Sequence, residues 1–149
     1  MKPKHYPLPF PKRYLNRRAV GIVTALGKAG FESYLVGGCV RDLLLGLQPK
    51  DYDIATSARP NQVRRLFRRS RIIGRRFKIV HVYGGREVFE VSTFRGPPPK
   101  HQKAATLMED NAFGTAEEDA HRRDFTMNSL FLDPRIPEIL DWENGWKGI

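Results

Sequence analysis

Two aspartates that flank a single tyrosine carry the strongest chemical signal in the sequence. Asp51 and Asp53 stand in the segment KDYDIAT. On a β-strand, residues two apart point to the same face, ~6.5–7 Å apart along the backbone. Two carboxylates so close need a cation, and magnesium prefers such hard oxygen ligands. The pair predicts a two-metal magnesium site for a hydroxyl attack. A solvated turn with a local hydrogen bond is the alternative explanation.

A glycine pair and an arginine precede these aspartates. Gly37 and Gly38 follow the apolar run YLV and open a short helical pattern, and Arg41 stands within one turn of them. Glycines at such a junction let backbone N–H groups approach an anion, and arginine matches phosphate oxygens. A glycine pair alone is commonly just a turn. Together with Arg41 and the aspartates, it predicts the site of a nucleoside triphosphate.

Further polar residues lie in the segment EEDAHRRDFTMNSL. If this segment is one helix, Asp124 and Asn128 share a face. Asp119 and Arg123 are four apart and do likewise. We expect Arg122 and Arg123 to bind a triphosphate or a ribose, and Asn128 to fix Asp124 or a sugar hydroxyl. Ion pairs on a surface helix are the alternative.

Glu90 lies in the strand pattern FEVSTFR, among apolar residues. It either faces solvent on the wet side of a sheet or completes the metal site from a neighbouring strand. His81 alternates with valines in another strand pattern and is expected to face solvent or RNA. None of the four histidines has zinc-site spacing with Cys39. The chemistry therefore rests on carboxylates and arginines.

Composition favours a polyanionic partner. The 149 residues include 26 Lys and Arg against 16 Asp and Glu, a net charge of +10, which suits nucleic acid. Seven arginines between residues 64 and 76 form either a solvated face or a ridge that contacts a nucleic-acid backbone without sequence specificity. No apolar run is long enough to span a membrane. The single cysteine rules out an internal disulfide and fits the cytoplasm.

Hydrophobic patterning predicts an α+β fold, with a small mixed or antiparallel sheet of about five strands and flanking helices. Residues 1–16 form a basic, proline-rich leader that either contacts RNA or folds onto the domain of residues 17–149. Residues 96–112 are expected to form a surface loop. The predicted helices are 17–30, 40–46, 60–69 and, after a capping box at Thr115 and Glu118, 117–131. The predicted strands are 33–36, 52–55, 71–73, 78–83 and 87–94, with a hairpin at Gly84-Gly85 and a short strand and turn within 138–149.

Four motifs resemble, in order and spacing, the head domain of class II nucleotidyltransferases. They are YLVGGCVRDLLLG, KDYDIAT, FEVSTFR and EEDAHRRDFTMNSL, and the resemblance spans roughly residues 20–145. This family holds the bacterial poly(A) polymerases and the CCA-adding tRNA nucleotidyltransferases. The segments IIGRRFKIVHV and RRDFTMNSLF are more similar to the poly(A) polymerase group.

The resemblance implies a role for each site residue. Asp51 and Asp53 would hold the magnesium ions, Asp124 would be a third active-site acid, and Glu90 would assist from the adjacent strand. The residues implied to bind the triphosphate or the sugar are Gly38, Arg41, Arg123 and Asn128.

The implied reaction is attack of an RNA 3′-hydroxyl on the α-phosphate of ATP, with release of pyrophosphate, as in RNA polyadenylation and mRNA processing. Family members continue into helical neck, body and tail domains, so we expect this chain to be a fragment with impaired activity of its own. The alternatives are CCA addition in tRNA processing, a non-catalytic RNA-binding module and, less in keeping with the charge, nucleotidyl transfer to a small molecule.

Overall fold

The computed structural model describes residues 2–96, 113–123 and 126–148. Its strands are β1 (Lys4–Pro7), β2 (Ser33–Val36), β3 (Tyr52–Thr56), β4 (Ser70–Ile73), β5 (Ile79–Gly84), β6 (Glu87–Thr93), β7 (Leu130–Asp133) and β8 (Glu138–Asp141). Its helices are α1 (Arg17–Lys28), α2 (Gly38–Leu44), α3 (Pro60–Leu66) and α4 (Ala116–Arg122), with 3-10 turns η1 (Lys12–Tyr14), η3 (Thr126–Ser129) and η4 (Gly145–Gly148).

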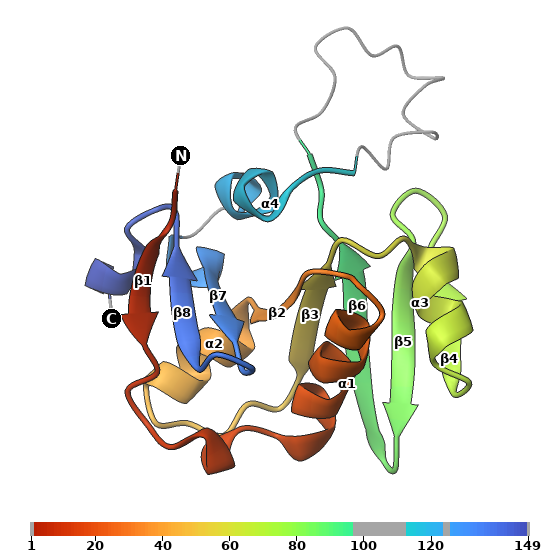
Figure 1. Ribbon diagram of the computed structural model, residues 1–149, viewed down its shortest axis with the longest axis horizontal. Helices are drawn as coiled ribbons and strands as arrows, with labels where there is room; N and C mark the ends of the chain where they lie inside the picture. The colour runs from red at the N-terminus through yellow and green to blue at the C-terminus, as the bar shows by residue number, and fades with distance from the viewer. Residues whose placement is uncertain (1, 97–112, 124–125, 149) are drawn as a thin grey trace, which may run out of the picture.

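Within the described residues, all eight strands form one sheet in the order β1-β8-β7-β2-β3-β6-β5-β4 (Figure 1). The β3–β6 pair is parallel, and the other pairs are antiparallel. The α+β class and the mixed sheet are therefore confirmed. The expected number of about five strands is wrong, because β1, β7 and β8 extend the sheet at one side.

The leader supplies one of the additional strands. β1 pairs with β8, and the Tyr6 ring stacks on Trp146 with ring centroids 4.5 Å apart. Of the two expectations for the leader, folding onto the domain is the one that the structure shows.

The second additional strand replaces the end of a predicted helix. α4 ends at Arg122, and the run LFLD, expected to begin as helix at Leu130 and Phe131, forms β7 with all four residues buried. A short, continuous apolar run is equally typical of a buried helix segment and of a buried strand, so its pattern cannot separate them. Pairing with β2 and β8 decides for the strand.

The two faces of the sheet have separate hydrophobic cores. On one face, α1, α2 and α3 pack through residues such as Val23, Val40 and Val63 against strand residues that include Ile54. On the other face, Ala55 belongs to a cluster that α4 covers. In Figure 1, α1 lies in front of β3 and β6. Because side chains alternate along a strand, Asp53, between Tyr52 and Ile54, points to the α4 face.

Local signals set several element ends, and two of them, the α4 capping box and the Gly84-Gly85 hairpin, were predicted. Asn16 caps α1 by accepting hydrogen bonds from two backbone N–H groups. Thr115 and Glu118 form the expected capping box of α4. Gly84 and Gly85 lie at the β5–β6 hairpin, where Gly85 has φ +60°. The predicted loop of residues 96–112 lies outside the described residues from residue 97 onward. Across the described ranges, none of the helices has the length and apolarity needed to cross a lipid bilayer.

Candidate active site

Two acidic side chains on adjacent strands meet at the centre of the sheet. Asp53 on β3 and Glu90 on β6 are direct partners in the parallel register. Asp51 lies just before β3, and all three acids line one open depression of about 520 Å³ together with His81. The Glu90 side chain is 47% exposed. It therefore faces solvent and also lies beside Asp53. The structure thus brings together three of the four predicted acids.

Asp53 is the electrostatic centre of this depression. Burial of its carboxyl, followed by the charge and hydrogen bond of Glu90, raises its pKa to about 6. Asp51 acts in the same direction, whereas the guanidinium of Arg123 acts in the opposite one. The nearby cation therefore only partly offsets the repulsion between carboxylates. A bound cation would relieve it.

The glycine bend faces Asp53. Gly37 joins β2 to α2 with φ +75° and ψ −148°, a backbone conformation that side chains with a Cβ rarely adopt. A Cβ at this position would lie 3.4 Å from Asp53 Oδ2 and 3.7 Å from Arg123 Nη1. The bend, an acid and an arginine therefore surround one point.

Arg41 lies one turn into α2. Its guanidinium contacts the Asp42 carboxylate, with Nη2 3.3 Å from Oδ1. The same Nη2 is 3.5 Å from the position that a Cβ on Gly38 would occupy. Arg41 therefore folds back over the start of its own helix, next to the bend, while part of its side chain remains exposed.

Arg123 reaches the site from the end of α4. Its Nη2 lies 2.9 Å from Asp119 Oδ1, an ion pair of the kind that the alternative explanation of this segment expected. Arg123 itself has an extended backbone, with ψ 131°, because the helix ends at Arg122. The helix predicted over residues 117–131 therefore ends earlier than expected.

The remaining predicted residues of this segment are separated by that helix end. Asp124 lies outside the described residues. Asn128 stands in η3, and its Oδ1 is buried without a hydrogen-bond partner among the described residues. Arg122 is exposed and lines a second, smaller pocket next to Arg123.

Two further residues carry no predicted catalytic role, His81 beside Glu90 and Phe77 beside Arg95. His81 on β5 is the register partner of Glu90, with Nε2 3.7 Å from Oε1. Phe77 lies under the guanidinium of Arg95, whose Cζ is 3.6 Å from the ring centroid. Phe77 belongs to the segment IIGRRFKIVHV, which was noted for its similarity to the poly(A) polymerase group. That similarity is the sequence feature that could have drawn attention to Phe77. The contact with Arg95 depends on strand pairing.

The acids suit a hard cation in chemical type. In the described residues, no group of three or more His, Cys, Asp or Glu side chains is arranged to hold a metal on its own. Magnesium commonly takes only one or two carboxylates and completes its shell with water and substrate phosphates. Asp51 and Asp53 fit that pattern. Burial and the neighbouring Glu90 raise the pKa of Asp53, and a bound cation would oppose that shift.

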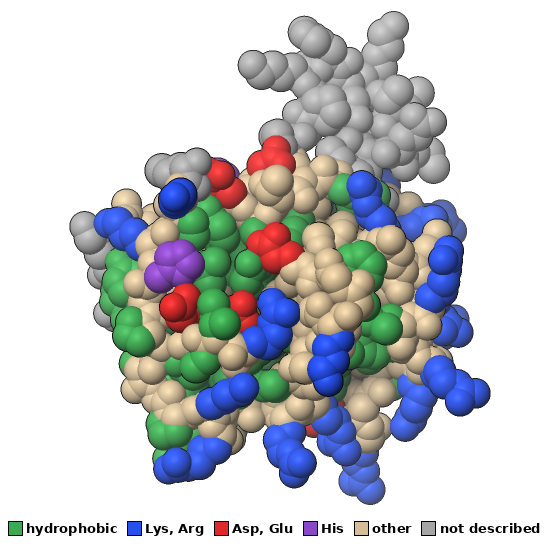
Figure 2. Space-filling view, viewed as in Figure 1, with side chains coloured by type: hydrophobic (Ala, Val, Ile, Leu, Met, Phe, Trp, Pro, Cys, Tyr) green, Lys and Arg blue, Asp and Glu red, His purple; other side chains and the backbone are tan. Residues whose placement is uncertain are grey.

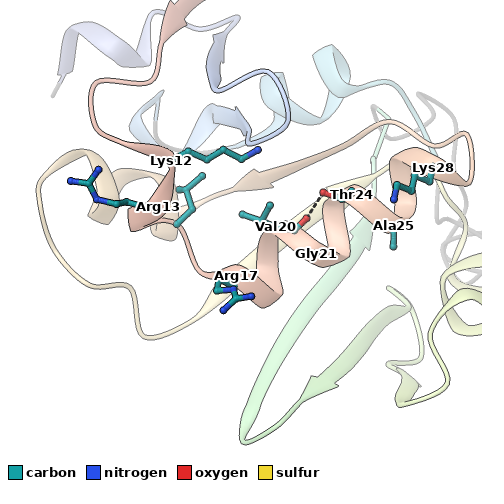
Figure 3. A pocket seen from close by; sticks show the side chains of 9 residues that line it. Lys12, Arg13, Arg17, Val20, Gly21, Thr24, Ala25 and Lys28 are labelled. Atoms are coloured by element: carbon teal, nitrogen blue, oxygen red, sulfur yellow. Dashed lines mark hydrogen bonds between the residues drawn. The ribbon is translucent and has the colours of Figure 1, made fainter.

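A larger groove, of about 640 Å³, lies elsewhere, along α1. Figure 3 shows its cations, Lys12, Arg13, Arg17 and Lys28, around a floor that includes Val20. Its lining contains no acid. Size alone would select this groove, but it has no group that could hold a metal, so the candidate active site is the depression beside β3.

Residues 33–149 match the family described as the poly A polymerase head domain. The chain belongs to this family. The expected class II nucleotidyltransferase head is thereby confirmed.

Relatives of this poly A polymerase head domain come from both branches. Poly(A) polymerase I of Haemophilus influenzae is 44% identical over 146 residues, which is 92% of this chain and 32% of that protein. A CCA-adding enzyme of Geobacillus kaustophilus is 42% identical over 134 residues, 89% of this chain and 32% of that protein. The chain thus spans about a third of the length of these relatives.

The fold has a solved counterpart. The crystal structure of the Bacillus stearothermophilus CCA-adding enzyme in complex with CTP superimposes with a TM-score of 0.73 at 36% identity. The match covers 87% of this chain and 30% of that one. This chain therefore shares its fold with part of a solved CCA-adding enzyme.

Proposed function

We propose that this head domain transfers AMP from ATP to the 3′ end of RNA and releases pyrophosphate, as a poly(A) polymerase would. The observation that carries the proposal is the meeting of Gly37, Asp53 and Arg123 around one point, with Glu90 alongside. Phosphoryl transfer depends mainly on positioning and on stabilising the charge of the phosphates. This site combines backbone N–H groups, a cation and acids suited to a metal in one place.

Each residue has a proposed task. Asp51 and Asp53 would hold magnesium, which supplies charge neutralisation at the phosphates and activation of the attacking hydroxyl. The N–H groups after the bend at Gly37 and Gly38 would hold phosphate oxygens, and Arg41 would leave Asp42 to join them.

Residues at and after the end of α4 would also contact the nucleotide. Arg123, fixed by Asp119, would contact a phosphate or the ribose, and Arg122 would lie near it. Asn128 has a buried Oδ1 without a described partner, which suits a ribose hydroxyl as donor. Asp124 and Glu90 are proposed as the further acids on the acceptor's side.

The reaction forms an ester bond between the RNA 3′ oxygen and the α-phosphorus. It breaks the α–β phosphoanhydride bond, and the hydroxyl proton passes to solvent. The net charge of +10 favours RNA over a small neutral acceptor. We place the reaction in the cytoplasm, in line with Cys39 as a free, buried thiol.

CCA addition to tRNA is the second candidate. The likeness to a CCA-adding enzyme in complex with CTP supports it, while the identity over 146 residues with poly(A) polymerase I supports polyadenylation. A primer comparison separates the two. Tailing of an arbitrary RNA supports the first candidate, and addition confined to tRNA ends supports the second.

Magnesium-dependent ATP binding by the 149-residue chain tests the site itself. We expect calorimetry to show ATP binding that requires magnesium and is lost in Asp51→Ala with Asp53→Ala. Lys12→Ala with Arg17→Ala, in the remote groove, is the matched control and should bind ATP as the parent does. ATP binding that persists in the aspartate variant would instead indicate a module without catalytic function.

A further inference from the structure

A second pocket lies on the same face of the sheet as the three acids. It has a volume of about 240 Å³ and lies where β5 and β6 meet the end of α4. Ser92 and Ile79 in its wall stand two residues from Glu90 and His81 on the same strands. Residues two apart share a sheet face, so the pocket continues the catalytic face. Arg123 lines it and also approaches the glycine bend.

The pocket contains an exposed aromatic ring. Phe77 is 47% exposed, and the Arg95 guanidinium covers part of it, with Cζ 3.6 Å from the ring centroid. Rings of this kind, often beside arginine planes, hold the bases of single-stranded nucleic acids by stacking. Stacking tolerates any base because every base has a π-face.

The rim of the pocket is cationic. Lys78, Arg95, Arg122 and Arg123 line it, and Asp119 is the acid in the lining. The oxygens of Asp119 are already engaged, Oδ1 by Arg123 and Oδ2 by the Arg95 backbone N–H at 2.9 Å. The pocket therefore presents positive charge to a phosphate.

The order of the strands indicates which reactant lies on the side of the pocket. Val36, next to the glycine bend, pairs with Asp53 from β2, whereas Glu90 pairs with Asp53 from β6. A triphosphate held at the bend lies on the β2 side. The attacking oxygen must enter opposite the leaving pyrophosphate, which is the side of β6 and β5. The pocket lies over those two strands.

We propose that this pocket receives the terminal nucleotide of the acceptor RNA, with its base stacked against Phe77 and Arg95 and its phosphate near Lys78 and Arg122. The inference rests on the proposed function, since it assumes that the triphosphate occupies the glycine bend. It assigns a role to the segment IIGRRFKIVHV, which contributes Phe77 and Lys78.

Two binding measurements on the same protein test it. A fluorescent single-stranded oligoadenylate reports RNA affinity, and calorimetry with ATP and magnesium reports the nucleotide site. We expect Phe77→Ala to weaken oligoadenylate binding roughly tenfold, as loss of one stacked base does, and to leave ATP affinity unchanged. Phe77→Trp, which keeps an aromatic ring at this position, should bind oligoadenylate with the affinity of the parent protein.

Tyr14→Ala is the matched control. Tyr14 is also an exposed aromatic residue, with the Arg13 guanidinium 5.2 Å from its ring centroid, but it lies in η1, away from the acids. Its loss should leave both affinities unchanged. Unchanged RNA affinity in Phe77→Ala, or an equal loss in Tyr14→Ala, would overturn the proposal.

The outcomes also separate this inference from the proposed function. If Phe77→Ala weakens ATP binding instead of RNA binding, the pocket holds the nucleotide, and the inference fails while the function stands. If the parent protein binds oligoadenylate through Phe77 but never binds ATP with magnesium, the function fails and the pocket is an RNA site without catalysis. Circular dichroism on each variant confirms that the fold is retained.

Discussion

The groove along α1 and the depression beside β3 lie on opposite faces of one sheet, and both have cations nearby. The groove is the larger, at about 640 Å³ against about 520 Å³, and has four Lys and Arg residues. The depression has Asp51, Asp53 and Glu90 in its wall and Arg123 close to Asp53. Cations alone can attract a polyanion, but transfer also needs groups that hold a metal and orient phosphates.

The distribution of Lys and Arg over the surface therefore does not identify the active site. Figure 2 shows the α1 face, with Lys and Arg side chains spread along its lower edge and over the side that α3 occupies. The arginines of residues 64–76 extend from α3 through β4 into the segment before β5. Arg71 on β4 pairs with His81, which pairs with Glu90. This row links the arginine-rich edge of the sheet to the acids, whereas the groove has no such link.

The largest expected effect is on transfer itself. Asp53→Asn keeps the size of the side chain but removes its charge, so we expect AMP transfer to fall by roughly a thousandfold. Lys12→Ala with Arg17→Ala should change transfer by less than about threefold, since surface charges contribute little. Extension of a labelled RNA on a gel measures both. Equal losses would mean that the comparison between the two regions is wrong.

Alanine substitutions at one glycine in each region compare the depression and the groove through the free energy of unfolding. Gly37→Ala should destabilise the fold by about 1–3 kcal/mol, because φ +75° is strained for alanine. It should also weaken ATP binding, since the new Cβ approaches Asp53 Oδ2.

Gly21, on α1 in the groove, is the control for that substitution. It lies inside a helix with open space at its Cβ position, so Gly21→Ala should stabilise the fold by about 0.5–1 kcal/mol and leave ATP binding unchanged. Urea denaturation gives both free energies of unfolding. A stabilising Gly37→Ala would contradict the strained bend.

The pH dependence of stability reports on Asp53. Its pKa in the folded protein is raised from 3.8 to about 6. The protonated carboxyl is thus favoured in the fold, and its contribution to stability is fully present below pH 3.8 and lost as the pH rises through about 6. We expect the melting temperature without metal to decline over this range, and Asp53→Asn to reduce the decline.

Magnesium should reverse part of that loss. Since the metal binds the ionised carboxylate, its stabilising effect should grow as the pH rises through about 6. Melting curves with and without magnesium, at several pH values, measure it. A magnesium effect that is the same at all pH values would argue against Asp53 as a ligand.

The smallest effect concerns the salt dependence of RNA binding. Arg68→Ala with Arg71→Ala should reduce the slope of log affinity against log salt by about 1 for each phosphate that the arginines no longer neutralise. Lys12→Ala with Arg17→Ala should leave the slope unchanged if RNA does not follow the α1 groove. Filter binding at several salt concentrations checks this, and the reverse result would place the RNA on the α1 face.

The sequence predicted the elements that depend on neighbours along the chain. Gly37-Gly38, the β3 acids and the capping box of Thr115 are local signals, each within a few residues, and backbone sterics and hydrogen bonding to near neighbours act at that range. The family resemblance followed from these same motifs. Leu130 and Phe131, the first half of the run LFLD, were wrongly placed at the end of a helix, because a short apolar run has no periodicity that separates helix from strand.

Tertiary structure decided which of those residues meet. The position of Glu90 beside Asp53 depends on the parallel register of β6 with β3. Arg123 approaches Gly37 from the residue that follows the end of α4. The contact of Phe77 with Arg95 likewise joins residues on separate segments. Strand pairing between distant segments is selected by the burial of both sheet faces together, a property of the whole fold that no single stretch of sequence contains.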